Sequence, residues 1–195
     1  MILPIIAYGS SVLKQKTAPL SKTYKQLDQL IENMWETMYA AHGVGLAAPQ
    51  VGLSLRLFVV DAAPFAQDES LSPTESTFLK GFKKVFINPI ILSENGTDWP
   101  FNEGCLSIPD VREDVMRKSS IEIEFEDEQF EKQRLTLDGL AARVVQHEYD
   151  HIEGILFTDH LSPLKKRLLK GKLNAISKGK CQVEYPMRFP TKTKR

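Results

Sequence analysis

The stretch DGLAARVVQHEYDHIEG, residues 138–154, decides how this chain folds. It starts with an aspartate, a preferred helix N-cap, and ends with a glycine, which commonly follows a helix C-terminus. Between them Leu140, Val144, His147 and His151 recur at helical spacing and share one face. We therefore predict an amphipathic helix with two histidines on a single face.

Within this helix, residues 147–151 read HEYDH and match the pattern H-E-x-x-H. Two histidines four positions apart lie on one helix face and can chelate one metal ion, with Glu148 beside it to accept a proton from water. Catalytic sites of this kind usually have three protein ligands, so a third is expected elsewhere. The alternative, two histidines that only form hydrogen bonds within a helix, stays open at this point.

Two positions decide where the third ligand is expected. Metzincin proteases extend the pattern to a further histidine, but Phe157 stands at that position although Gly154 matches. Cys105 in the segment EGCLS, residues 103–107, is the better candidate because a thiolate next to glycine can approach an ion closely. Taken alone, a cysteine is more often a small buried hydrophobic residue, and Cys181 has no comparable setting.

Regular secondary structure is predicted on both sides of these motifs. Residues 23–26 have capping-box spacing before an apolar helical stripe, which Gly43 ends. The β-strands are predicted at Leu55–Asp61, Val85–Leu92, Ile121–Glu126 and Gln133–Leu137. A basic helix is predicted after Pro163, and the polar composition of residues 62–81 predicts a surface excursion, either a lid or a decoration.

Composition restricts the class of protein. The chain has 195 residues, 42% of them hydrophobic, so it can form one core, and we expect a single α+β domain over residues 1–195. Its 25 basic and 25 acidic residues cancel, which argues against a general nucleic-acid or membrane coat. Two cysteines and the lack of an export signal predict a cytoplasmic location, with an organelle as the alternative.

Three segments together resemble the signature motifs of peptide deformylases, in the same order along the chain. They are Gly43–Gln50, Glu103–Ser107 and Gln146–His151. The opening residues 2–13 are also similar to the usual start of the family, so the resemblance covers most of the chain. Residues 62–81 and the tail after Lys180 are less typical.

The resemblance implies a fold and a metal centre. It implies antiparallel β-sheets wrapped around a central metal-binding helix, with one helix towards each end of the chain. It also implies that Cys105, His147 and His151 hold one divalent ion, with water at a fourth position. Iron(II) is the expected ion and zinc, nickel or cobalt are substitutes, although ligand type alone suits zinc at least as well.

The implied reaction is hydrolysis of the N-formyl group of the initiator methionine, with release of formate. Glu148 would accept a proton from the attacking water and later protonate the departing amine. The Gln50 side chain and the Leu106 backbone N–H would stabilise the negative charge that develops on the formyl oxygen. These three residues are the expected catalytic set.

Substrate binding is expected around the motifs. The resemblance implies that the Gly45 backbone pairs with an extended N-formyl-methionyl nascent peptide. The pocket for the methionine side chain is expected from Val44, Gly104, Leu140 and Val144. A charged Arg143 at a helix position near this pocket is unexpected. Arg112, which follows the second motif, resembles an arginine near the family's site, but a surface salt bridge explains it equally well.

The sequence leaves open two alternative functions and one possible binding partner. A zinc endopeptidase would use the same helix but would need a third histidine or glutamate ligand. A non-catalytic ribosome-associated module would hold a structural metal, usually with four protein ligands. The basic segment within residues 163–195 suits ribosomal RNA, although a solvated surface explains it equally well.

Overall fold

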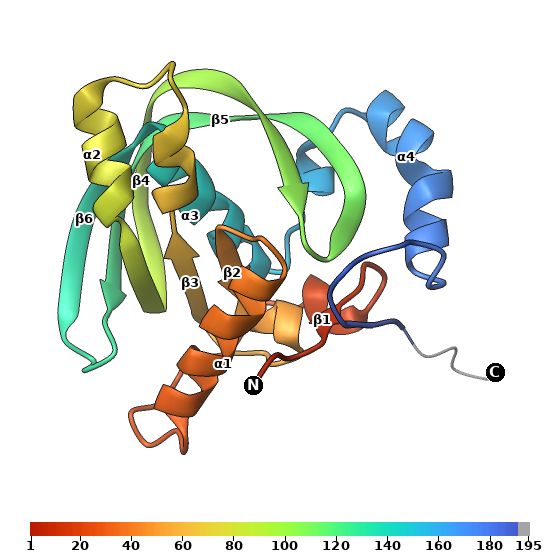
Figure 1. The fold of residues 1–195 in the computed structure, drawn as a ribbon, viewed down its shortest axis with the longest axis horizontal. Helices are drawn as coiled ribbons and strands as arrows, with labels where there is room; N and C mark the ends of the chain where they lie inside the picture. Colours follow the sequence, from red (N-terminus) through yellow and green to blue (C-terminus); the bar gives the residue numbers. More distant parts are fainter. Residues whose placement is uncertain (191–195) are drawn as a thin grey trace.

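The computed structural model describes residues 1–190, and a five-stranded antiparallel sheet forms its frame (Figure 1). The strands lie in chain order, β2-β3-β4-β5-β6. Their bounds are Gly45–Ala47, Leu57–Asp61, Lys83–Cys105, Ile108–Glu126 and Lys132–Asp138. A separate two-stranded sheet pairs β1 (Ile5–Ile6) with β7 (Met187–Arg188) and is parallel rather than antiparallel. The α+β class and the antiparallel main sheet are confirmed.

Strands β4 and β5 are much longer than the segments 85–92 and 121–126 that alternation predicted. They form one hairpin whose register shifts at four points, for example between Asn95 and Asp98. Bulges of this kind bend and twist a strand pair. The hairpin therefore arches away from the rest of the sheet and ends in a turn at Leu106 and Ser107 (Figure 1).

Four α-helices and four 3-10 helices complete the described part of the chain. The α-helices are α1 Leu27–Ala40, α2 Pro73–Gly81, α3 Gly139–Ile152 and α4 Pro163–Ile176. The 3-10 helices are η1 Ser11–Lys14, η2 Ala48–Val51, η3 Ala63–Gln67 and η4 Phe157–His160. Within the predicted excursion, η3 and α2 bury Ala66 and Leu79 in the same apolar cluster as α3.

The helix predicted over residues 138–154 is α3, and the sheet encloses it. Asp138 stands at the N-cap position, but its side chain makes no capping hydrogen bond. Gly154 has a φ of 75°, and a Cβ there would lie 2.8 Å from the backbone of Lys14, so only glycine fits this close approach. Because α3 contacts β2, β3, β5 and β6, the buried helix face meets the core.

The capping box predicted at residues 23–26 is wrong. Gln26 has a left-handed backbone with a φ of 62°, and α1 starts after it without a side-chain cap. The Thr23 N–H donates instead to Ser21 Oγ at 3.2 Å. Packing of the buried apolar stripe against β2 and β3 therefore stabilises α1. None of the helices within residues 1–190 has both the length and the apolar character needed to cross a membrane.

Candidate metal centre and substrate cavity

Three side chains with metal-binding atoms meet between α3 and the end of β4. His147 and His151 project from α3 with ring centroids 5.1 Å apart, and Cys105 is the last residue of β4. The donor atoms of the three residues lie within 4.8 Å of one another. Sγ of Cys105 is 3.3 Å from Nε2 of His151. The arched hairpin thus brings together the three residues predicted as metal ligands.

The electrostatics of this cluster suit a divalent cation. Burial opposes ionisation of the Cys105 thiol, but His151 and His147 outweigh it and lower the pKa of Cys105 to about 5. Burial also disfavours charge on His147, yet hydrogen bonds to Cys105 and Glu103 raise its pKa well above the ordinary value. A thiolate and imidazoles that share protons can release them to a metal ion, so the residues fit one.

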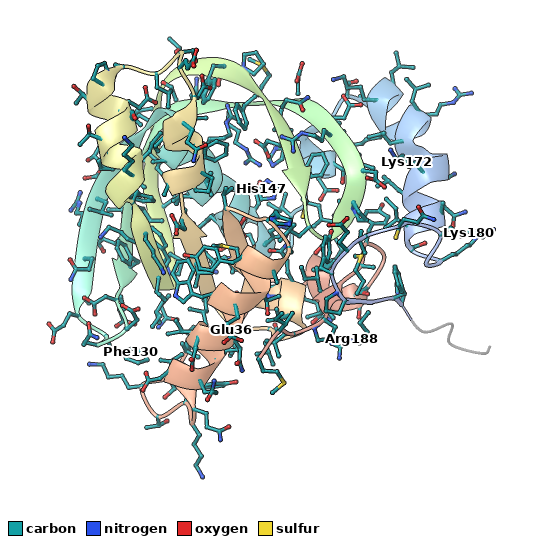
Figure 2. The ribbon with its side chains drawn as sticks, viewed as in Figure 1. Glu36, Phe130, His147, Lys172, Lys180 and Arg188 are labelled. Atoms are coloured by element: carbon teal, nitrogen blue, oxygen red, sulfur yellow. The ribbon has the colours of Figure 1, made fainter. Side chains whose placement is uncertain are left out.

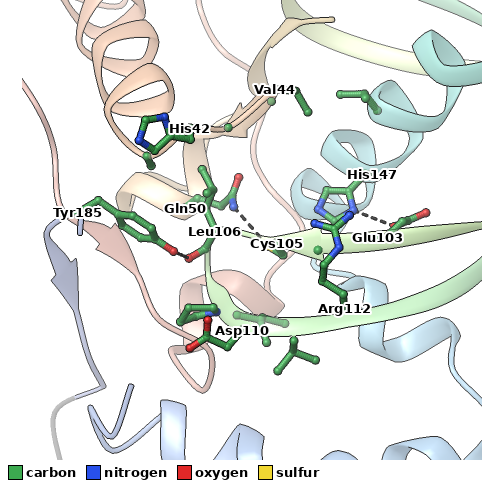
Figure 3. A pocket seen from close by; sticks show the side chains of 18 of the residues that line it. His42, Val44, Gln50, Glu103, Cys105, Leu106, Asp110, Arg112, His147 and Tyr185 are labelled. Atoms are coloured by element: carbon green, nitrogen blue, oxygen red, sulfur yellow. Dashed lines mark hydrogen bonds and ion pairs between the residues drawn. The ribbon is translucent and has the colours of Figure 1, made fainter. Parts of the chain in front are cut away.

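A buried carboxylate orients His147 from behind. Nδ1 of His147 is 2.9 Å from Oε2 of Glu103 (Figure 3). Arg117 donates to both Glu103 oxygens, at 2.7 and 3.0 Å. Burial would raise the pKa of Glu103, but the hydrogen bonds from His147 and Arg117 keep it far below its usual value. With Nδ1 engaged in this way, Nε2 is the His147 nitrogen available to a metal.

Glu148 is buried beside the two histidines and lines a cavity that opens next to them. Its Oε2 atom has no hydrogen-bond partner among the described residues, and burial raises the pKa of Glu148 to about 7. Gly45 makes room for this side chain, since a Cβ there would lie 2.7 Å from Cδ of Glu148. A carboxylate with a free oxygen and a near-neutral pKa suits proton transfer.

Gln50 points its amide nitrogen at the metal-binding cluster. Its Oε1 accepts a hydrogen bond from the Ala47 N–H at 2.9 Å, which fixes the orientation of the amide. Nε2 consequently lies 3.5 Å from Sγ of Cys105 (Figure 3). It also lies 3.4 Å from Oγ of Ser107. Gln50 belongs to η2, directly after the edge strand β2, so the Gly-rich loop and this amide are positioned together.

A cavity of about 620 Å³ opens next to these groups. Nine of the predicted site residues line it: Val44, Gly45, Gln50, Gly104, Cys105, Leu106, Val144, His147 and Glu148. His151 lies behind the lining, in contact with Cys105.

Leu140 is not among the residues that line the cavity, and its part in the methionine pocket stays a prediction. It lies in the first turn of α3 and packs in the core cluster with Ile121 and Leu137. Arg143 does line the cavity, but its guanidinium donates to Glu103 and to the Trp99 carbonyl, at 3.1 and 2.7 Å. Its charge is therefore directed into the buried network.

Sequence reasoning missed several residues of the cavity wall. Phe65 from η3 and Phe101 from β4 pack edge to face, 6.2 Å between centroids, and both line the cavity. The only local signal for Phe65 is an aromatic residue inside a polar segment. Residues 182–185 also line the cavity, and no motif marks them. Arg112 lines it too and donates to Asn102 Oδ1 at 2.9 Å, without a salt bridge to any described residue.

Comparisons with known proteins agree with this site. Residues 2–167 match the family model described as Polypeptide deformylase. The protein named Peptide deformylase from Christiangramia forsetii is 63% identical over 194 residues, 100% of this chain and 99% of that protein. Its counterpart from Flavobacterium johnsoniae is 57% identical, over 97% of this chain and 96% of that protein.

Solved structures agree as well. The crystal structure of a peptide deformylase from Legionella pneumophila has a TM-score of 0.76 and 36% identity, over 91% of this chain and 96% of that chain. That of the peptide deformylase from Thermus thermophilus has a TM-score of 0.78 and 36% identity, over 92% of this chain and 100% of that chain. With its sequence, fold and ligand cluster in agreement, this chain belongs to the peptide deformylase family.

Proposed function

We propose that this enzyme performs deformylation in the cavity beside Cys105, His147 and His151, and that these three residues hold one divalent metal ion. The family reaction is removal of the formyl group from the N-terminal methionine of new polypeptides, with release of formate. The observation that carries the proposal is the grouping of the three donor atoms within 4.8 Å, next to a buried glutamate. The family assignment rules out the endopeptidase and the structural metal module.

The identity of the ion is part of the proposal. A bound divalent ion would polarise the formyl carbonyl and lower the pKa of a water molecule. We propose iron(II), with zinc, nickel or cobalt as substitutes. The resemblance to deformylases supports iron, whereas one thiolate with two imidazoles suits zinc equally well.

Glu148 is the proposed general base and acid. Its unpartnered Oε2 is available to accept a proton from the attacking water, and its pKa near 7 lets it return that proton to the leaving amine. Gly45 supports the role sterically, because the glycine lets Glu148 approach β2. Glu148→Gln would keep the size of this side chain but remove the base.

Gln50 and Leu106 are the proposed donors to the formyl oxygen. The fixed amide of Gln50 presents Nε2 to the same space as Sγ of Cys105. Leu106 lies in the turn directly after Cys105 and lines the cavity, so its backbone N–H is the second proposed donor. Donors that are held in place before the reaction stabilise the developing negative charge without reorganisation.

The substrate is proposed to lie along β2 as an added strand. β2 is an edge strand of the sheet, and Gly45 pairs on one side with Val60 of β3, which leaves its other edge for a partner. Main-chain pairing depends little on the sequence that is bound, which suits an enzyme acting on many N-termini. The methionine side chain would occupy the apolar wall near Val44, Gly104 and Val144.

We further propose one deformylase domain over residues 1–195, a bacterial cytoplasmic location and a ribosome contact through α4. Pairing of β7 with β1 ties the end of the described chain to its start and supports the single domain. The bacterial relatives support the location.

Lys172 and Lys180 lie at the edge of the molecule and His147 near its middle, so α4 and the following turn are open to a partner (Figure 2). The last residues of the predicted tail, 191–195, lie outside the described residues.

The proposed site is tested by anaerobic purification, elemental analysis and hydrolysis of a formyl-Met peptide. We expect about one metal ion per chain and release of formate. Glu148→Gln should bind metal as the wild type does but lose about 100-fold or more of kcat, in line with removal of a general base. A Glu148→Gln enzyme with wild-type turnover would refute the assignment of the base.

A further inference from the structure

The C-terminal segment after α4 returns to the active site. α4 ends at Ile176, and the chain then runs back to β7, which pairs with β1. On this path residues 182–185 line the substrate cavity. The match to the family model ends at residue 167, so this part of the cavity wall lies beyond the segment that the model describes.

Within this segment, Tyr185 contacts the turn that joins β4 to β5. Its hydroxyl donates a hydrogen bond to the backbone carbonyl oxygen of Leu106 at 2.8 Å (Figure 3). Cys105 pairs with Ile108 at the end of the hairpin, which makes Leu106 one of two residues in the connecting turn. Tyr185 therefore holds the residue whose N–H is proposed to bind the formyl oxygen.

Two further contacts hold the same turn. The carbonyl oxygen of Ser107 accepts a hydrogen bond from the Tyr8 N–H at 2.9 Å. The Leu106 side chain packs closely on Gly43, where an added Cβ would lie 2.8 Å from Cδ1 of Leu106. These contacts fix the following residue and the side chain, whereas Tyr185 fixes the carbonyl of the Leu106–Ser107 peptide and so restricts rotation about the Cα of Leu106, to which the N–H is also joined.

We infer that Tyr185 is a positioning residue for deformylation, which orients Leu106 so that its N–H points to the formyl oxygen. The inference rests on the proposed role of Leu106. Tyr185 acts through the turn, and no contact of its hydroxyl with the substrate is required. Stabilisation of a developing oxyanion depends on donors held in place beforehand, and displacement of a group by about 1 Å can cost on the order of 100-fold in rate.

The test is Tyr185→Phe in the full-length, metal-loaded enzyme, assayed with a formyl-Met peptide. Phenylalanine keeps the ring and removes the hydrogen bond. We expect kcat to fall roughly 10- to 100-fold while KM stays within about twofold, because the lost interaction acts in the transition state. Tyr24→Phe is the matched control. The Tyr24 hydroxyl makes no hydrogen bond to a described residue, and the ring packs in the cluster around α1, so both constants should be unchanged.

Metal content and thermal midpoint are measured on the same samples. A lower kcat with wild-type KM and metal content, and a thermal midpoint close to that of wild type, supports the inference. Unchanged kcat, or a loss of kcat that follows a loss of metal, overturns it. Gln50→Ala distinguishes the positioning role of Tyr185 from the proposed oxyanion site itself. If only Tyr185→Phe is fully active, the positioning role alone fails; if both variants are fully active, the proposed oxyanion site fails as well.

Discussion

Nδ1 of His147 lies 2.9 Å from Oε2 of Glu103, whose side chain is almost completely buried. The same carboxylate receives hydrogen bonds from Arg117 and Arg143. A proposed metal ligand is thus oriented by a charge that is itself balanced by two buried guanidinium groups. Partners of this kind fix the ring orientation of a ligating histidine and increase its basicity.

Glu103→Gln should therefore weaken metal binding and destabilise the fold. We expect metal affinity to fall about 10- to 100-fold, the usual cost of losing such a partner. The free energy of unfolding should fall by about 3 kcal/mol, because Arg117 and Arg143 lose a buried counter-charge. Competition titration with a chelator and chemical denaturation measure the two effects.

Glu113→Gln is the control for Glu103→Gln. Glu113 pairs with Lys165 at 2.7 Å and both side chains are partly exposed, so neither metal affinity nor stability should change by more than about 1 kcal/mol. Wild-type metal affinity in Glu103→Gln would contradict the idea that this carboxylate orients His147.

The two cysteines provide a matched test of the metal centre. Both are half-buried and free, but only Cys105 lies near the histidines. Cys105→Ser should lose bound metal and deformylation, because a serine hydroxyl does not ionise near neutral pH as this thiol does. Cys181→Ser should keep about one metal ion per chain and wild-type activity. Elemental analysis of both variants decides the matter, and equal metal content in the two would exclude Cys105 as a ligand.

Gly45→Ala tests the close packing between β2 and the proposed base. A Cβ at this position would lie 2.7 Å from both Cγ and Cδ of Glu148, so the carboxylate must move. We expect kcat to fall about 100-fold with the metal retained, since a displaced base loses its alignment. Gly81→Ala, where an added Cβ meets nothing within 4 Å, should behave as wild type in the same assay. Full activity of Gly45→Ala would show that Glu148 need not stay where it lies.

The metal helix and its ligands could be predicted because their signals are local. The spacing of His147 and His151 places both rings on one helix face whatever the rest of the fold does. The glycine before Cys105 is likewise a local signal for close approach. The approach of Cys105 to the two histidines depends on the arched hairpin. Only the resemblance to deformylases predicted this approach.

The remaining parts of the site carried no local pattern. The sequence revealed only the open end of the hairpin, residues 85–92 of β4 and 121–126 of β5. The strands continue past these segments through register shifts that interrupt alternation. Helical spacing placed Leu140 on the same face of α3 as His147, and the resemblance to deformylases assigned it to the methionine pocket. Spacing does not show how far the cavity extends along α3, whose first lining residue is Arg143. Phe65 and Tyr185 reach the cavity through contacts between segments distant in sequence, which composition and spacing do not report.

Phe65 leads to a last prediction, about substrate preference. It lines the cavity from the excursion over residues 62–81 and packs against Phe101, so it adds apolar surface to the cavity that Val144 also lines. Phe65→Ala should raise KM for a formyl-Met peptide about tenfold, because an apolar side-chain contact contributes about 1–3 kcal/mol to discrimination. KM for a formyl-Ala peptide should change much less, since a methyl group does not reach this wall.

Phe78→Ala is the comparison that isolates this effect. Phe78 belongs to α2 of the same excursion but is 49% exposed and does not line the cavity. Its loss should leave both KM values as in the wild type, even where stability falls slightly through the lost contact with Phe82. If Phe65→Ala and Phe78→Ala shift the preference for methionine over alanine equally, the excursion acts through general stability and Phe65 has no part in the methionine pocket.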